Sequence, residues 1–173
     1  MTDQERAFIN RIGPMAQASQ RQYGVPASVT IAQAILESSN KSGWGQSRLA
    51  LEANNYFGIK HREGVDEPYV DFRTHEFFNK QDQIVMAHFR SFDSPEASFN
   101  AHAALLAGLP RYAKAMRDKN DPGLFSEQLQ DCGYSTDPEY AGRLKFLIGE
   151  YHLYEWDAAA PESPDPPATQ ANV

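Results

Sequence analysis

Apolar residues recur at helical spacing near the start of the chain. Their intervals of three or four residues predict an amphipathic helix over about 3–23. Gly13-Pro14 lies inside this stretch and predicts a break or a kink. Gly24-Val25-Pro26 then ends the helix, and Pro26 suits the first position of a second helix, where a missing N–H costs nothing. The apolar face of the first helix contains Phe8, Ile12, Ala16 and Ser19.

The second helical segment is apolar around most of its circumference. Between Val29 and Leu36 only Thr30 and Gln33 are polar. We therefore expect this helix to be largely buried. At about 100° per residue, Thr30, Gln33 and Glu37 share one narrow polar stripe. Glu37 thus emerges where a buried helix meets a polar surface.

The pattern changes to strand-like alternation between residues 56 and 92. Aromatic and β-branched residues alternate with polar ones in 72–78 and again in 84–89, which predicts two strands. Asn79-Lys80-Gln81-Asp82 between them is typical of the turn of a hairpin. Glu76 shares a strand face with apolar side chains. A second carboxylate is therefore predicted on a partly apolar face.

Helical signals return in the last part of the chain. Cap residues followed directly by proline mark three of the predicted helix starts. The predicted helices run from Ser94-Pro95 to Gly108, over about 110–117, from Asp121-Pro122 to near Cys132-Gly133, and from Asp137-Pro138 through a buried stripe of Leu144, Leu147, Ile148 and Tyr151. The domain is expected to close around Trp156.

Length and composition indicate one domain. A chain of 173 residues, of which 41% are hydrophobic, can bury one sizeable core. We expect residues 1–157 to form that domain. Residues 158–173 contain four prolines and almost no large apolar side chain, which is typical of a disordered tail or a truncated linker.

Charge and hydropathy exclude several classes of partner. A formal net charge of −7, with no dense basic cluster, argues against a nucleic-acid-binding protein. No segment is long and apolar enough to insert into a membrane, and the N-terminus lacks the basic stretch and apolar run of a signal peptide. A protein of this sequence that acts outside the cytoplasm would then need an export route other than a signal peptide, or would have to belong to a larger assembly.

Metal and redox chemistry are not indicated. The five histidines are scattered, without the His-Glu-x-x-His spacing or a comparable ligand pattern, so we expect no metal and no cofactor. The single cysteine, Cys132, excludes an internal disulfide and is expected to be a small buried apolar residue. The chain is expected to act as a monomer.

The position of Glu37 has a chemical consequence. The negative end of the helix dipole and a partly apolar environment both raise the pKa of a carboxyl group. A carboxylic acid that stays protonated near neutral pH can protonate a glycosidic oxygen. Helix position alone does not distinguish this role from that of an ordinary solvated glutamate.

The segment after Glu37 favours a cleft that binds a saccharide. It is small, polar and rich in glycine except for Trp44, which suits a loop at the rim of a cleft. Trp44, Tyr56 and Phe57 offer flat apolar faces on which a sugar ring can lie. Each of these aromatic residues taken singly also fits a core position.

Several motifs in order resemble one family. Ala32-Gln33-Ala34-Ile35-Leu36-Glu37-Ser38, Gly43-Trp44-Gly45-Gln46-Ser47 and Ala53-Asn54-Asn55-Tyr56-Phe57-Gly58-Ile59-Lys60 are similar to family 73 of the glycoside hydrolases, the bacterial peptidoglycan N-acetylglucosaminidases. The similarity continues through Thr74-His75-Glu76-Phe77, Phe89-Arg90-Ser91-Phe92, Arg111-Tyr112-Ala113 and the segment 133–141. It covers about residues 8–151.

The resemblance implies a fold and a set of site residues. The fold would be α+β and lysozyme-like, with a mainly helical lobe and a small β-hairpin lobe flanking a saccharide groove. Glu37 would be the general acid, and Tyr134 and Tyr140 would line the catalytic cleft. Glu76 is the candidate second carboxylate. The residues implied to shape the groove are Trp44, Asn55, Phe57 and Lys60.

One departure from the family pattern concerns Trp44. In many members a single small residue separates the glutamate from the Gly-Trp-Gly element, whereas Ser39-Asn40-Lys41-Ser42 intervenes here. Four residues are about one helical turn. The insertion would either lengthen the helix or form a longer loop over the groove, and it affects the position of Trp44 more than that of Glu37.

The implied reaction is hydrolysis of the β-1,4 bond after N-acetylglucosamine in the glycan strands of the bacterial cell wall. Glu76 would activate water at about 6.5–9.5 Å from Glu37 or act as nucleophile at about 5–5.5 Å. Alternatively the substrate's own N-acetyl oxygen would attack, with Glu76 or a tyrosine stabilising the intermediate. Rivals for this second role are Asp71, Glu63, Asp66 and Glu67. A muramidase, a lytic transglycosylase and a noncatalytic saccharide-binding module remain alternatives. Flagellar, phage, autolysin and secreted-toxin contexts all stay open.

Overall fold

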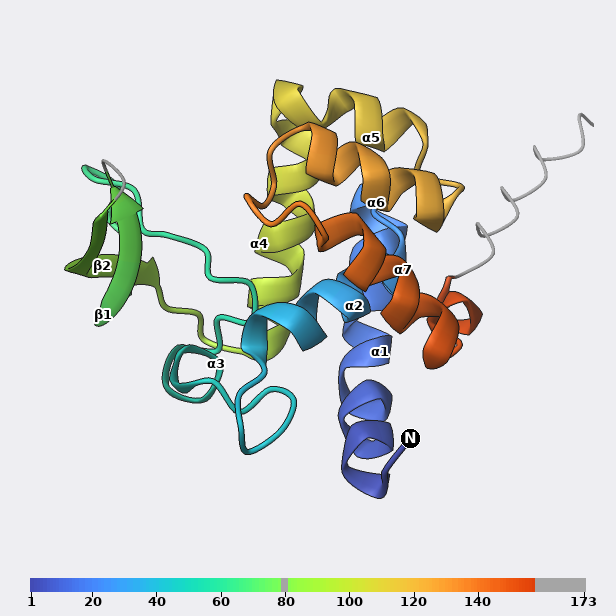
Figure 1. Cartoon of the computed structure of the whole chain (residues 1–173), viewed down its shortest axis with the longest axis horizontal. Helices are drawn as coiled ribbons and strands as arrows, with labels where there is room; N and C mark the ends of the chain where they lie inside the picture. The colour runs from blue at the N-terminus through green and yellow to red at the C-terminus, as the bar shows by residue number, and fades with distance from the viewer. Residues whose placement is uncertain (79–80, 158–173) are drawn as a thin grey trace, which may run out of the picture.

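The structure is a computed structural model that describes residues 1–78 and 81–157, with the backbone alone for residues 74–78 and 81–85. The predicted tail, 158–173, and the predicted turn residues Asn79 and Lys80 lie outside the described residues. Helices form a compact body, and one antiparallel hairpin projects from its side (Figure 1). The elements are α1 (Asp3–Tyr23), α2 (Ala27–Ser38), α3 (Arg48–Ala53), β1 (Tyr69–Phe78), β2 (Gln81–Arg90), α4 (Pro95–Gly108), the 3₁₀ helix η1 (Pro110–Tyr112), α5 (Ala113–Arg117), α6 (Pro122–Asp131), α7 (Tyr140–Glu150) and the 3₁₀ helix η2 (Leu153–Trp156).

Helix α1 is long and lies on the outside of the helical body. A capping box starts it, in which the Glu5 N–H donates to Thr2 Oγ1 and the Thr2 N–H donates to the Glu5 carboxylate. The helix continues through Pro14, so of the two predicted alternatives, a break or a kink, the break is wrong. Proline removes one helical hydrogen bond, and the burial of the predicted apolar face, which the structure confirms, holds the helix together across that position.

Helix α2 lies at the centre of the helical body (Figure 1). Every residue from Ala27 to Ile35 is buried, which confirms the prediction from the apolar pattern. Pro26 caps this helix instead of occupying its first position. The carboxylate of Asp157 accepts a hydrogen bond from the Ser28 N–H at 2.9 Å and so satisfies one of the free donors at the helix start.

The hairpin confirms the two predicted strands and extends them. In its register Phe72 pairs with Ala87, and Glu76 pairs with Gln83. Gln81 and Asp82, predicted as turn residues, belong to β2. The hairpin is attached at its base, where the His61 N–H donates to the His88 carbonyl and the Arg90 N–H donates to the Ile59 carbonyl, both at 2.9 Å.

The C-terminal helices follow the predictions with two changes. Ser94 caps α4, which ends at Gly108 as expected. The segment 110–117 divides into η1 and α5. Helix α7 begins at Tyr140 and not at Asp137, because the Asp137 carboxylate accepts from the Glu139 N–H and forms a turn before the helix.

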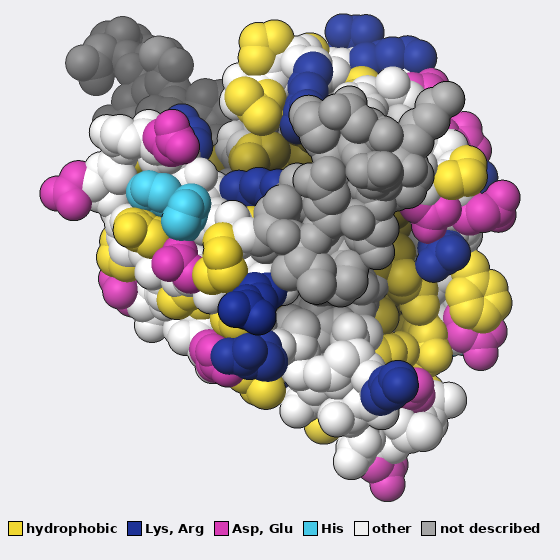
Figure 2. Space-filling view, turned by 60° about the vertical axis from the view of Figure 1, so that its left-hand side comes forward, with side chains coloured by type: hydrophobic (Ala, Val, Ile, Leu, Met, Phe, Trp, Pro, Cys, Tyr) yellow, Lys and Arg dark blue, Asp and Glu magenta, His cyan; other side chains and the backbone are white. Residues whose placement is uncertain are grey.

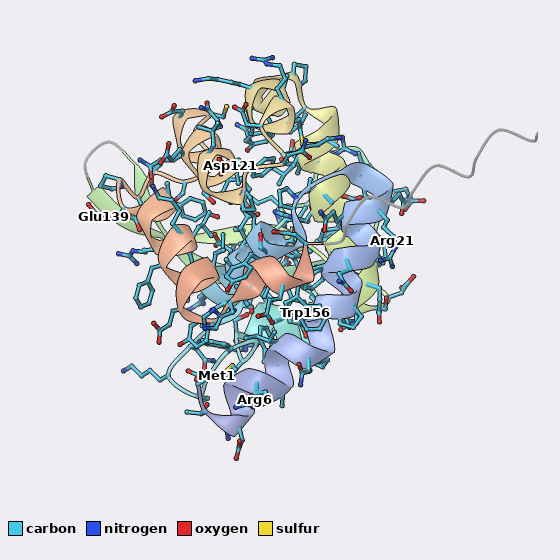
Figure 3. All side chains as sticks on the ribbon, turned by 90° about the vertical axis from the view of Figure 1, so that its right-hand side faces the viewer. Met1, Arg6, Arg21, Asp121, Glu139 and Trp156 are labelled. Carbon is cyan, nitrogen blue, oxygen red and sulfur yellow. The ribbon has the colours of Figure 1, made fainter. Side chains whose placement is uncertain are left out.

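The C-terminal end of the domain packs on α1. The ring of Trp156 lies against Gly13, where an added Cβ would come within 2.5 Å of ring carbon Cζ3. Figure 3 shows Trp156 next to α1, on the side opposite the hairpin. Trp156 thus packs against α1, near the position where the domain is expected to end.

Candidate active site

A cleft of about 670 Å³ lies between the base of the hairpin and the helical body. Figure 2 shows the face of the molecule that carries the hairpin, with several Lys and Arg side chains along it. The cleft brings together Glu37, the predicted general acid, and residues from four other parts of the chain. Its lining includes Glu37, Phe57, Lys60, Glu67, His102 and Tyr134.

Glu37 lies in the last turn of α2 and faces the cleft. The residue keeps solvent-exposed surface on that side, although its carboxyl group is closely surrounded by protein. Desolvation raises the pKa of this carboxyl group, and a hydrogen bond from Tyr140 partly opposes the shift. The direction is the one predicted from the sequence. A ligand can therefore reach a carboxyl group that holds its proton more tightly than a solvated glutamate.

Two tyrosines from the C-terminal part of the chain meet this acid. Tyr140, buried at the start of α7, donates a hydrogen bond from its hydroxyl to Glu37 Oε1 at 3.4 Å. Gln33, one turn before Glu37, donates from Nε2 to the Tyr140 hydroxyl at 2.9 Å. The rings of Tyr134 and Tyr140 stack with centroids 5.4 Å apart. Burial and the nearby Glu37 raise the pKa values of both tyrosines, so both hydroxyls stay protonated at neutral pH.

His102 extends this network, a position that was not predicted from the sequence. Its Nε2 lies 3.2 Å from the Tyr134 hydroxyl, and its ring stacks on Phe57 with centroids 4.0 Å apart. Burial lowers the pKa of His102 to about 3, so the ring is neutral. One signal was present in the sequence, because His102 falls between Phe99 and Leu106 on the buried face of α4.

The surroundings of His102 favour one form of its neutral ring. The Tyr134 hydroxyl lies 3.2 Å from Nε2 and can accept a hydrogen bond from it. We therefore assign the imidazole proton to Nε2. Among the described residues, His102 Nδ1 has no hydrogen-bond partner, as expected for the unprotonated nitrogen in an apolar pocket. His102, Tyr134 and Tyr140 thus lie in a continuous row of contacts that ends at the carboxyl group of Glu37.

Of the residues implied to shape the groove, two line the cleft and two lie elsewhere. Phe57 and Lys60 line it. Asn55 is buried, and its side chain binds backbone, donating to the carbonyls of Ile59 and Arg90 at 2.9 and 2.8 Å and accepting from the Ile59 N–H. Its amide therefore holds the base of the hairpin.

Trp44 packs away from this cleft, between Phe8 and Tyr151. The inserted residues do not lengthen α2. They form a tight turn in which the backbones of Asn40 and Gly43 exchange two hydrogen bonds of 3.1 Å. This turn carries Trp44 toward the N-terminus of α1, where it lines a second cavity.

The candidates for the second carboxylate lie in different settings. Glu76 is on β1, and its side chain lies outside the described residues. Glu67 lines the cleft, where it pairs with Arg90 Nε at 2.9 Å and lies 3.4 Å from His61 Nδ1. Asp71 pairs with His88 at 2.6 Å, and Glu63 and Asp66 are exposed.

Within residues 1–78 and 81–157, no group of three or more His, Cys, Asp and Glu side chains is arranged to hold a metal ion. None of the helices in that part of the chain combines the length and apolarity needed to cross a membrane. Cys132 is half-buried and packs against the core.

Comparison with known proteins extends these observations. The chain is 34% identical to the exo-glucosaminidase LytG of Bacillus subtilis over 163 residues, which is 92% of this chain and 56% of that protein. It is 34% identical to the peptidoglycan hydrolase FlgJ of Pseudomonas aeruginosa over 161 residues, 91% of this chain and 39% of that protein. The chain therefore spans about half, or less, of the length of these relatives.

A solved structure shows the same fold. The catalytic domain of the autolysin Auto from Listeria monocytogenes superposes with a TM-score of 0.78 at 31% identity, covering 91% of this chain and 89% of that one. The predicted α+β, lysozyme-like fold is thereby confirmed. Residues 13–153 match the family Glucosaminidase, described as mannosyl-glycoprotein endo-beta-N-acetylglucosaminidase. With a match over most of its length, from α1 to η2, the chain belongs to the glucosaminidase family of glycoside hydrolases.

Proposed function

We propose that this chain hydrolyses the β-1,4 bond after N-acetylglucosamine in peptidoglycan glycan strands, with Glu37 as the general acid. One observation carries the proposal. The Glu37 carboxyl group faces an open cleft, yet desolvation raises its pKa and a buried tyrosine holds its orientation. These are the properties required of an acid that protonates a poor leaving group.

Tyr140 and Tyr134 complete the proposed machinery. Tyr140 fixes the rotamer of Glu37 through its hydroxyl, and it stabilises the carboxylate that remains once the proton has left. Tyr134 lines the cleft beside it, close to the position of the bound sugar. Phe57 and Lys60 are proposed to contact the glycan from the opposite wall.

Glu76 is our candidate for the second carboxylate. Its place on β1 puts it on the hairpin, which stands across the cleft from α2. Glu67 is the main rival because it lines the cleft, but its carboxylate is engaged by Arg90 and lies near His61. We therefore expect Glu67 to hold the base of the hairpin and Glu76 to take part in the reaction.

The substrate follows from the relatives. Proteins named peptidoglycan hydrolase, exo-glucosaminidase and autolysin share this domain. We infer that this chain also works at the bacterial cell wall. The family description is of an endo-acting enzyme, and we propose cleavage within strands, which the length distribution of the products would test.

The decisive experiment compares the wild type with Glu37→Gln on purified cell walls. We expect cleavage to fall by at least about 10³-fold, with binding and folding retained, because the variant keeps the shape of the side chain and loses its proton. Mass spectrometry of the released muropeptides should show reducing N-acetylglucosamine ends in the wild type. Anhydro-muramic ends would indicate a lytic transglycosylase, and equal activity of Glu37→Gln would refute the role of Glu37.

The same assay assigns the second carboxylate. Glu76→Gln is expected to abolish cleavage at an unchanged melting temperature. Glu67→Gln should lower stability more than it lowers the rate, because it leaves Arg90 without its ion-pair partner. The reverse pattern would assign the second role to Glu67.

A further inference from the structure

We propose that the cleft contains a subsite for carboxylate groups borne on O3 of muramic acid, with Arg62 and Arg111 as its ligands. The proposal rests on the function proposed above and adds the part of the substrate that the cleft recognises. A glycan strand of the cell wall alternates N-acetylglucosamine with muramic acid, so such a carboxylate recurs on every second sugar. Where a peptide is attached, the lactyl carboxyl group is an amide and the carboxylates are those of the peptide. Where no peptide is attached, the lactyl group itself supplies the carboxylate.

The first observation is the charge of the cleft. The chain as a whole carries a net charge of −7, yet the described lining contains Lys60, Arg62, Arg90 and Arg111. The acids in that lining are Glu37 and Glu67. Even with both acids ionised, the four basic side chains outnumber them, and Glu67 is paired with Arg90. The cleft is therefore positive on a negative protein, which concentrates anionic ligands there.

The second observation is the placement of two arginines. Arg62 lies in the segment that leads from α3 to the hairpin, and Arg111 lies in η1, directly after α4. The two residues therefore come from the two sides of the cleft. Both are exposed, and within the described part of the chain neither forms an ion pair with a carboxylate.

Arg111 is also held in place. Its guanidinium lies 4.7 Å from the ring centroid of Tyr112, a tyrosine that is fully buried. Such cation–π contact orients the guanidinium plane and leaves N–H groups available. A guanidinium binds a carboxylate through two parallel hydrogen bonds, which gives direction as well as attraction.

This chemistry separates two kinds of β-1,4 glycan. A strand containing muramic acid brings carboxylates to the arginines, whereas an oligomer of N-acetylglucosamine is neutral and brings none. A groove that recognised the sugar ring alone would need aromatic faces and neutral polar groups. The arginines thus make the cleft selective for cell-wall strands over chitin.

Binding is measured in the Glu37→Gln background, so that the ligand remains intact. The calorimetric probes are a peptide-bearing peptidoglycan tetrasaccharide, the same tetrasaccharide after an amidase has removed the peptides, and chitotetraose. The variants are Arg62→Gln, Arg111→Gln and the double substitution. Arg117→Gln is the matched control, because this exposed arginine ends α5 and does not line the cleft.

We expect each single variant to raise Kd for the carboxylate-bearing ligands by about threefold, and the double variant by about tenfold. Kd for chitotetraose, and the Kd values of Arg117→Gln, should stay within about twofold of the parent. An effect confined to the peptide-bearing ligand identifies the peptide carboxylates as the source. An effect confined to the amidase-treated ligand, in which the lactyl carboxylate is freed from its amide bond, identifies the lactyl group. An effect on both anionic ligands shows that the arginines accept a carboxylate from either source. If the parent does not bind chitotetraose measurably, the subsite is tested by comparing the Kd values of the double variant and of Arg117→Gln for the carboxylate-bearing ligands.

Three results would overturn the subsite: unchanged Kd values in the double variant, an equal loss for chitotetraose, or an equal loss in Arg117→Gln. The last would show a general field effect of the protein's charge. Cleavage by Glu37→Gln is scored separately. Residual cleavage there would refute the catalytic role of Glu37, while the ratio of Kd values would still decide the subsite. Unchanged melting temperatures of the arginine variants exclude misfolding.

Discussion

The helical body and the hairpin differ in how their residues are held. In α2 almost every side chain before Leu36 is inaccessible to solvent. On the hairpin, Tyr69 and Met86 are 51% and 55% exposed, and Ala87 is buried. The body thus fixes its side chains through packing, whereas the hairpin is held mainly by its own backbone ladder and by its base.

The two proposed catalytic groups therefore lie in regions of different rigidity. The proposed proton donor lies in the rigid half, where its pKa and orientation depend on packed neighbours. The candidate second carboxylate lies on an arm that stands out from the body (Figure 1). An isolated two-stranded hairpin is only marginally stable in water. The distance across the cleft therefore depends on the anchors at the base of the hairpin, of which Asn55 is the most deeply buried.

Tyr140→Phe removes a hydrogen bond from the rigid half and is expected to have the largest effect. The activity should fall by about a hundredfold, because Glu37 loses the group that orients it. That bond lowers the pKa of Glu37 against the effect of burial. Its loss raises the pKa further, so the alkaline limb of kcat/KM should move to higher pH. Tyr154→Phe, an exposed tyrosine on η2, serves as the control, and an alkaline limb that moved to lower pH would contradict the assignment.

Asn55→Ala breaks the attachment of the hairpin. The carbonyls of Ile59 and Arg90 and the Ile59 N–H lose a buried partner, so the free energy of unfolding should fall by about 3 kcal/mol. Amide exchange is expected to rise more in the hairpin than in α2. Asn10→Ala, on the exposed side of α1, should change stability by less than about 0.5 kcal/mol. Uniform exchange across both regions would show that Asn55 stabilises the whole domain alike.

Gly13→Ala tests the packing of the helical body. The added Cβ would approach Trp156 to 2.5 Å. Overpacking lowers the free energy of unfolding by about 1–3 kcal/mol, and the higher helix propensity of alanine offsets about 1 kcal/mol of that loss. We expect a net loss of about 1 kcal/mol by chemical denaturation, with activity retained. Gly142→Ala in α7 meets nothing within 4 Å and should be neutral or slightly stabilising. Equal effects at both glycines would show that Trp156 moves aside freely.

Met86→Gln places a polar side chain on the exposed surface of β2 and should have the smallest effect. A change within about 0.5 kcal/mol is expected, because no packing is lost. Thermal unfolding measures it. A larger loss would mean that the hairpin contributes apolar packing to the stability of the domain.

Short-range patterns in the sequence predicted much of this architecture. Burial of α2 and the emergence of Glu37 at its end follow from residue spacing within one helix. The hairpin follows from two-residue alternation, and the start of α4 follows from Ser94-Pro95. Each of these features depends on neighbours a few residues apart, where the periodicity of the backbone determines which side chains share a face.

The remaining features depend on contacts between distant segments. Tyr140 reaches Glu37 across 103 positions, and only the family resemblance placed it at the cleft. An asparagine amide binds sugar or backbone equally well, so the residue type of Asn55 does not reveal its role. The position of Trp44 depends on the turn from Asn40 to Gly43, whose closure a count of inserted residues does not determine.

The contact between Asp157 and Ser28 also has a mechanical consequence. Residues 158–173 continue the chain from Asp157, so tension along that continuation first loads the hydrogen bond to Ser28 and the contact of Trp156 with Gly13. The contact with Ser28 lies at the opposite end of α2 from Glu37, and Gly13 belongs to α1. A domain tethered through this end would bear force at the start of the helix, while the acid at its other end keeps its geometry.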